Sequence, residues 1–125
     1  MRRSIALGVA FAGILTVGQP AQANSKPTFN KDVLPILQEN CQVCHRPSGA
    51  NMGGMVAPMA LTTYEETRPW AKSIAKNVSQ RKMPPWHASP AQHGDFRNER
   101  TLTQEEIDTV VAWVESGTPR GNRQD

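Results

Sequence analysis

The stretch Cys41-Gln42-Val43-Cys44-His45 contains both cysteines of this 125-residue chain and one of its three histidines. Cysteines three residues apart at the end of a helix share a face, where their sulfurs can form thioethers with the two vinyl groups of a haem. His45 follows directly and can turn its imidazole toward the iron from the same side. In an exported chain this pattern is the attachment signature of c-type haem. The motif therefore predicts one haem c, bound covalently through Cys41 and Cys44.

The first 23 residues have the pattern of a secretory signal peptide. A basic start (1–3) is followed by a largely apolar run (5–17) and by a small-residue cleavage site at 21–23. The apolar run is too short to span a bilayer, although a retained membrane anchor is the alternative. We therefore expect a signal peptide over 1–23, export to the periplasm, no transmembrane segment after cleavage, and a single domain over 24–125.

The composition argues against nucleic acid as a partner and in favour of a cofactor or cross-link in the core. Cleavage removes two arginines from a chain of formal net charge +3, so the mature chain is close to neutral. Without a basic stripe to neutralise phosphates, nucleic acid is not expected as a partner. Hydrophobic residues make up 38% of the chain, and many of them lie in the leader. A small domain with so lean a core usually gains a disulfide, a metal or a cofactor, and haem would supply the missing apolar mass.

Periodicity predicts an all-α fold without a sheet. Apolar residues at helical spacing indicate a first helix over 29–40, with Pro35 in its first turn. A loop rich in Pro and Gly follows over 46–60 and is long enough to wrap around a bound group. We place its Met52 and Met55 near the haem edge.

Two Thr-x-x-Glu capping boxes predict where later helices begin. The first starts at Thr63, Pro69 kinks or restarts that helix, and its end is expected at 79–82. Trp70, Ile74 and Val78 form its predicted buried stripe. The second box, at 103–106, starts a terminal amphipathic helix of about 13 residues. Its apolar positions and its stop signal are Ile107, Val110, Val111, Val114 and Gly117.

A methionine is the expected second axial ligand. Met83 precedes two prolines, which stiffen the loop and hold the thioether against the iron with little ordering cost. Ligation by His and Met fills both axial positions and raises the reduction potential relative to two histidines. Met59 is the rival ligand, and a core methionine that fills a gap is the alternative role for Met83. His87 and His93 fit surface histidines better than ligands.

The two cysteines allow two other interpretations. A redox-active disulfide needs a βαβ context, which this chain lacks. A structural zinc site would use Cys41, Cys44 and two of the three histidines His45, His87 and His93. Such sites are uncommon in exported chains with so few cysteines.

Several segments together resemble small class I cytochromes c, and others are similar to a bacterial group of monohaem cytochrome c domains, some of them fused to other redox modules. The segments that resemble class I cytochromes c are Cys41–His45, 83–85 and 103–114. The segments similar to the bacterial monohaem domains are 57–59, 63–70 and 81–86. The resemblance covers about 29–117, and the CxxCH motif is its most specific part. The chain departs from the simplest members by a long insertion at 86–100.

The resemblance implies a small cytochrome c-like helical fold wrapped around a covalently bound haem. His45 would be the proximal ligand and Met83 the distal one. The carbonyl of Pro58 would accept the His45 N–H bond, which fixes the imidazole tautomer and raises its basicity. The terminal helix would cross the first helix near Trp113.

By the same likeness, Tyr64, Arg68 and Trp70 would donate hydrogen bonds to the haem propionates, with ordinary helix capping and packing as the alternative. We expect an electron carrier that serves redox partner proteins, is not an enzyme, and requires a haem attachment machinery. The alternatives are a haem-based catalyst or ligand sensor with a displaceable distal Met, and a haem module that docks to a larger oxidoreductase.

Overall fold

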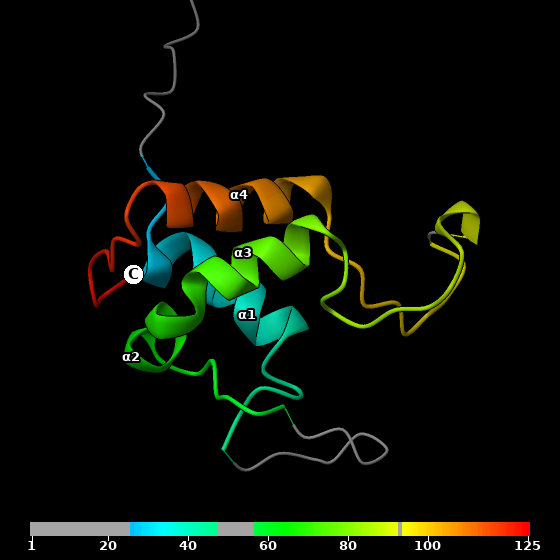
Figure 1. Ribbon diagram of the computed structural model, residues 1–125, viewed down its shortest axis with the longest axis horizontal. Coiled ribbons are helices and arrows are strands. Elements are labelled where there is room, and N and C mark those ends of the chain that lie inside the picture. Colours follow the sequence, from blue (N-terminus) through cyan, green and yellow to red (C-terminus); the bar gives the residue numbers. More distant parts are fainter. Residues whose placement is uncertain (1–25, 48–56, 93) are drawn as a thin grey trace, which may run out of the picture.

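The computed structural model describes residues 26–47, 57–92 and 94–125 (Figure 1). The predicted signal peptide, much of the long loop 46–60, Met52, Met55 and His93 lie outside these ranges. Within them every regular element is helical, which confirms the all-α prediction. None of these helices combines the length and the apolar character that a membrane crossing requires.

The first helix begins as a π-helical turn, Phe29–Val33, and continues as α1, Leu34–Asn40. In the π turn the amide of Val33 donates to the carbonyl of Thr28, five residues back, at 3.2 Å. Pro35 is an early residue of α1 and brings no N–H of its own. A wider turn before a proline relieves the clash of its ring with the preceding turn. The predicted helix over 29–40 is confirmed, with this local widening added.

The next helical region consists of three pieces. α2, Tyr64–Thr67, begins at the predicted capping box, in which Thr63 Oγ1 accepts from the Glu66 amide and the Glu66 carboxylate accepts from the Thr63 amide. A 3-10 turn, Arg68–Trp70, leads into α3, Ala71–Ser79. The predicted start, restart and end of this helix are therefore confirmed.

Trp70 does not belong to the buried stripe of α3, and this part of the prediction is wrong. Its side chain is 43% exposed, whereas Ala71, Ile74 and Val78 are buried. A 3-10 turn advances by about 120° per residue instead of about 100°. This change of phase turns Trp70 outward, so the stripe starts at Ala71.

The terminal helix α4, Gln104–Glu115, begins at the second capping box and has nearly the predicted length. It lies beside α3 (Figure 1), and it also contacts the π-helical turn that begins the first helix. Side chains from these three helices and from two flanking loops form the core. Its buried hydrophobic members are Phe29, Val33, Leu37, Leu61, Ala71, Ile74, Val78, Leu102, Ile107, Val110 and Trp113.

Trp113 connects the two ends of the domain. It is fully buried, and its ring centroid lies 5.9 Å from that of Phe29 in the first helix. Its indole N–H donates to the carbonyl of Pro119 at 2.9 Å, and the Phe29 amide donates to the same carbonyl at 2.9 Å. The predicted contact of the terminal helix with the first helix at Trp113 is confirmed.

Candidate functional site

A cavity of about 210 Å³ joins the end of α1, the segment that follows the long loop, and the turn at Met83. Its walls carry two thiols, an imidazole and a thioether among mostly apolar side chains. The lining residues are Asn40, Cys41, Val43, Cys44, His45, Ala57, Pro58, Met83, Pro84, Pro85 and Arg100. The structure thus brings the CxxCH motif, Pro58 and Met83 to one place.

The CxxCH motif lies in a tight turn directly after α1. The amides of Cys44 and His45 both donate to the carbonyl of Cys41, at 3.1 and 2.9 Å. This turn places both cysteines and the histidine on the wall of the same cavity, as their spacing predicts.

The imidazole of His45 is oriented by a backbone carbonyl, although not the expected one. Its Nδ1 lies 3.1 Å from the carbonyl oxygen of Met59. A carbonyl only accepts, so Nδ1 carries the proton and Nε2 keeps its lone pair for a metal. The acceptor is one residue beyond Pro58, which corrects the prediction. Pro58 lines the cavity instead, and the chain leaving it turns the next carbonyl toward the ring.

Gln42, a middle position of the motif, adds a bond that the sequence did not reveal. Its Nε2 donates to the carbonyl of Leu61 at 2.9 Å, while the Leu61 amide donates to the carbonyl of His45 at 2.9 Å. Together with the bond between His45 and Met59, these bonds fasten the motif to segment 59–61. The motif specifies only its cysteines and histidine, so it carries no signal for Gln42.

Cys41 and Cys44 are free, partly buried thiols. Burial, together with the neighbouring Glu106 and Cys44, raises the pKa of the Cys41 thiol to about 12. Among the described residues, no three His, Cys, Asp or Glu side chains gather as a metal-ion ligand set. The zinc and disulfide interpretations gain no support there.

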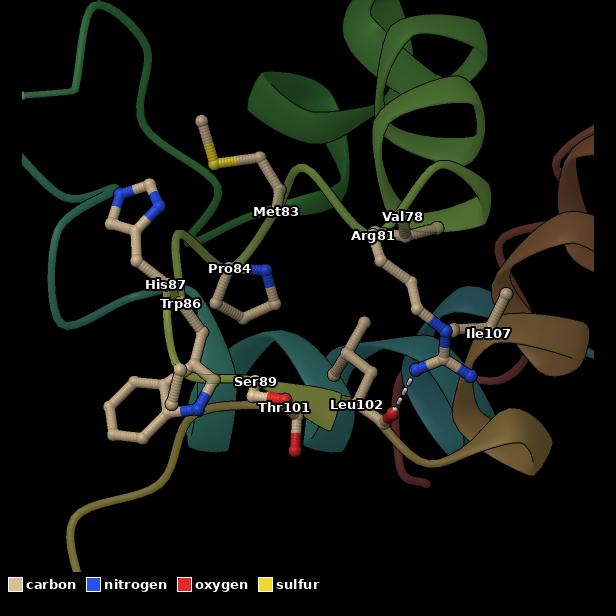
Figure 2. A pocket seen from close by; sticks show the side chains of 11 residues that line it. Val78, Arg81, Met83, Pro84, Trp86, His87, Ser89, Thr101, Leu102 and Ile107 are labelled. Atoms are coloured by element: carbon tan, nitrogen blue, oxygen red, sulfur yellow. Dashed lines mark hydrogen bonds between the residues drawn. The ribbon is translucent and has the colours of Figure 1, made fainter. Parts of the chain in front are cut away.

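The two candidate methionines have different surroundings. Met59 is partly buried against the core, and its carbonyl is engaged by His45. Met83 is 43% exposed and lines the cavity of the CxxCH motif as well as a second cavity of about 260 Å³. In Figure 2 the Met83 thioether points away from Leu102, on the same side as the exposed imidazole of His87.

Helices α3 and α4 both hold the start of the Met83 turn. The Arg81 guanidinium donates to the carbonyl of Leu102 at 3.2 Å (Figure 2) and to the side chain of Gln104 at 2.9 Å. The amide of Lys82 donates to the carbonyl of Asn77 at 2.9 Å. Because these bonds come directly before Met83, they fix where its side chain can reach.

The three residues expected at the haem propionates do not line this cavity. The hydroxyl of Tyr64 donates to the carbonyl of Thr118 at 2.9 Å, and its ring packs edge-on against Phe29 at 5.4 Å. Arg68 lines a separate hollow beside the end of α4. Trp70 is turned outward by its 3-10 turn. Capping and packing, the alternative roles, describe their contacts.

The chemistry of the cavity fits a covalently bound haem. Two thiols are the groups to which a c-type haem is attached, and an imidazole with a free Nε2 lone pair and a thioether are donor types that haem iron accepts. Val43, Pro84 and Pro85 contribute apolar surface of the kind that a porphyrin needs.

A protein-family model described as Cytochrome c matches residues 35–118, about two thirds of the chain. This span begins in α1, ends just after α4 and contains every residue that lines the cavity. No curated protein and no solved structure was found to match the chain.

Proposed function

Because the chain belongs to the cytochrome c family, we propose that it is a monohaem carrier that passes single electrons between redox proteins in the periplasm. The family binds haem c covalently through two cysteines, and Cys41 and Cys44 are positioned for this. When bound, haem supplies an iron that alternates between the ferric and ferrous states. The observation that carries the proposal is that the CxxCH motif and Met83 line one cavity.

His45 is the proximal ligand in this proposal. Its Nδ1–H group donates to the Met59 carbonyl, which holds the ring in one tautomer and makes Nε2 more basic. The turn after α1 and the bond from Leu61 hold the backbone of His45. The imidazole therefore needs little rearrangement when the redox state changes.

Met83 is the distal ligand in this proposal, and Met59 is not. The side chain of Met83 lines the cavity. The side chain of Met59 instead packs against the core. With His45 and Met83 on the iron, no coordination site is left for a substrate, so electron transfer through the exposed edge is the reaction that remains. Val43, 38% exposed, and Met83, 43% exposed, line the cavity and would flank this edge.

Substitution of each methionine tests the distal assignment. We expect Met83→Ala to abolish the weak long-wavelength absorption of a thioether bound to ferric iron and to lower the reduction potential. Met59→Leu should keep the band, because this side chain packs against the core. Loss of the band in Met59→Leu alone would reverse the assignment.

Pyridine haemochrome spectra of the denatured protein test covalent attachment. Wild-type protein should keep its haem through extraction with acidified organic solvent, and a Cys41→Ala, Cys44→Ala double variant should lose it. If the reduced native protein binds carbon monoxide readily, the iron has an open site, and the ligand-sensor or catalyst alternative replaces the carrier.

The pattern of residues 1–23 supports a periplasmic location. A haem attached through two thioethers also requires an attachment machinery that acts on the unfolded chain. Fractionation of an expressing cell should place the red protein in the periplasm with Asn24 as its first residue. A haem protein recovered in the cytoplasm with its leader intact would contradict this location.

A further inference from the structure

Glu106 links the first turn of α4 to the residue before Cys41. Its Oε1 accepts from the side-chain amide of Asn40 at 3.2 Å. Its Oε2 accepts from the Thr103 amide at 2.7 Å and from the Thr103 hydroxyl at 3.0 Å. Asn40 and Cys41 both line the cavity of the CxxCH motif. A carboxylate from the far end of the sequence is thus held beside the haem attachment site.

The Glu106 carboxylate lies close to the haem attachment turn in partly buried surroundings. Glu106 is half-buried, and Cys41 is packed against the core. Asn40, which donates to Glu106, directly precedes Cys41 and lines the same cavity. A charge that acts across partly buried surroundings is screened less than one in water.

We infer that Glu106 is a positioning residue that holds Asn40 against the haem attachment turn and lowers the reduction potential of the site. The inference rests on the proposed electron-carrier function. When a partner protein gives one electron to ferric iron, the positive charge at the iron falls by one unit. A fixed negative charge nearby favours the ferric state, so it opposes this reduction.

Two substitutions separate the charge of Glu106 from its hydrogen bonds. Glu106→Gln removes the charge and keeps one side-chain oxygen for the Thr103 amide, because the capping box accepts either Glu or Gln at this position, but it loses the bond from Asn40. Glu106→Asp keeps the charge but shortens the side chain and weakens the box. The matched control is Glu105→Gln, on the same turn of α4, because Glu105 is exposed and does not line the cavity.

Potentiometric titration of the purified holoproteins is the measurement, with denaturant unfolding as the second readout. Glu106→Gln should favour reduction by about twofold to tenfold in the equilibrium constant, as for one partly screened unit charge; tenfold is about 59 mV for one electron. Its stability should fall less than that of Glu106→Asp, because it keeps the bond to the Thr103 amide. Glu106→Asp should keep the wild-type potential and lose stability, and Glu105→Gln should change neither by a comparable amount.

The outcomes separate this inference from the proposed function. If Glu106→Gln shifts the potential no more than Glu105→Gln, or if Glu106→Asp shifts it as much as Glu106→Gln, Glu106 has only a structural role and the inference is wrong. A purified wild-type protein without covalent haem would instead contradict the electron-carrier function itself.

Discussion

Single residues of the site are held largely by main-chain atoms. The ring of His45 is oriented by the carbonyl of Met59, and the side chain of Gln42 bonds the carbonyl of Leu61. The identity of a side chain says little about which backbone carbonyl it will meet. The sequence could therefore single out His45 as the expected ligand, but it placed the acceptor of the imidazole N–H one residue too early, at Pro58.

The contribution of Gln42 can be measured directly. Gln42→Leu removes the 2.9 Å bond to Leu61 and leaves that carbonyl without its partner. We expect the holoprotein to lose about 1 kcal/mol of unfolding free energy in denaturant titration, with an unchanged haem spectrum. Gln38→Leu, at an exposed position of α1, is the control and should cost much less. Equal losses in the two variants would show that the bond does not stabilise the site.

At the scale of elements, helix starts were predictable because their signals are local. Thr63 and Thr103 each bond a residue three positions on, so the sequence shows the whole capping box. The orientation of Trp70 depends on the 3-10 turn around Pro69, which apolar spacing does not reveal. The hydroxyl of Tyr64 meets Thr118, far along the chain, and no local pattern could predict that bond.

The capping box of α4 gives a prediction at this scale. Thr103→Ala removes the oxygen that accepts from the Glu106 amide and the hydroxyl that donates to its carboxylate. We expect a loss of about 1 kcal/mol in unfolding free energy, measured by denaturant titration. Thr103→Ser keeps the hydroxyl and should recover most of this loss. A serine variant as unstable as the alanine variant would mean that the methyl group, and not the cap, is responsible.

For the whole molecule, Trp113 is the residue on which closure of the fold depends most. It packs against Phe29 and bonds Pro119, so it joins the start and the end of the domain. Trp113→Ala should cost about 3–5 kcal/mol, a large part of the roughly 5–15 kcal/mol that stabilises a small domain. Trp70→Ala is the matched control, because Trp70 is 43% exposed and a surface change usually costs within about 0.5 kcal/mol. Thermal unfolding followed by circular dichroism should show a much lower unfolding temperature for Trp113→Ala than for Trp70→Ala.

Haem removal tests whether the cofactor belongs to the interior of the domain. The site cavity measures about 210 Å³ and adjoins a second cavity of about 260 Å³ across Met83 and Pro84. A porphyrin bound in the first cavity would cover its largely apolar lining and add to the buried apolar surface that stabilises the fold. Because the stability of a small domain is only roughly 5–15 kcal/mol, the protein lacking haem should lose most of its cooperative transition.

The double variant Cys41→Ala, Cys44→Ala, purified without haem, is the protein to melt beside wild type. Alanine at both positions removes the thioethers but leaves the described core of eleven buried hydrophobic side chains intact. Met83→Ala serves as the comparison, because it keeps the tethered porphyrin and loses only the proposed axial ligand. Its unfolding temperature should therefore lie between those of wild type and the double variant. If the colourless double variant unfolds as cooperatively and at the same temperature as wild type, the helices close without the cofactor. The porphyrin would then occupy a preformed cleft and would not help to build the core.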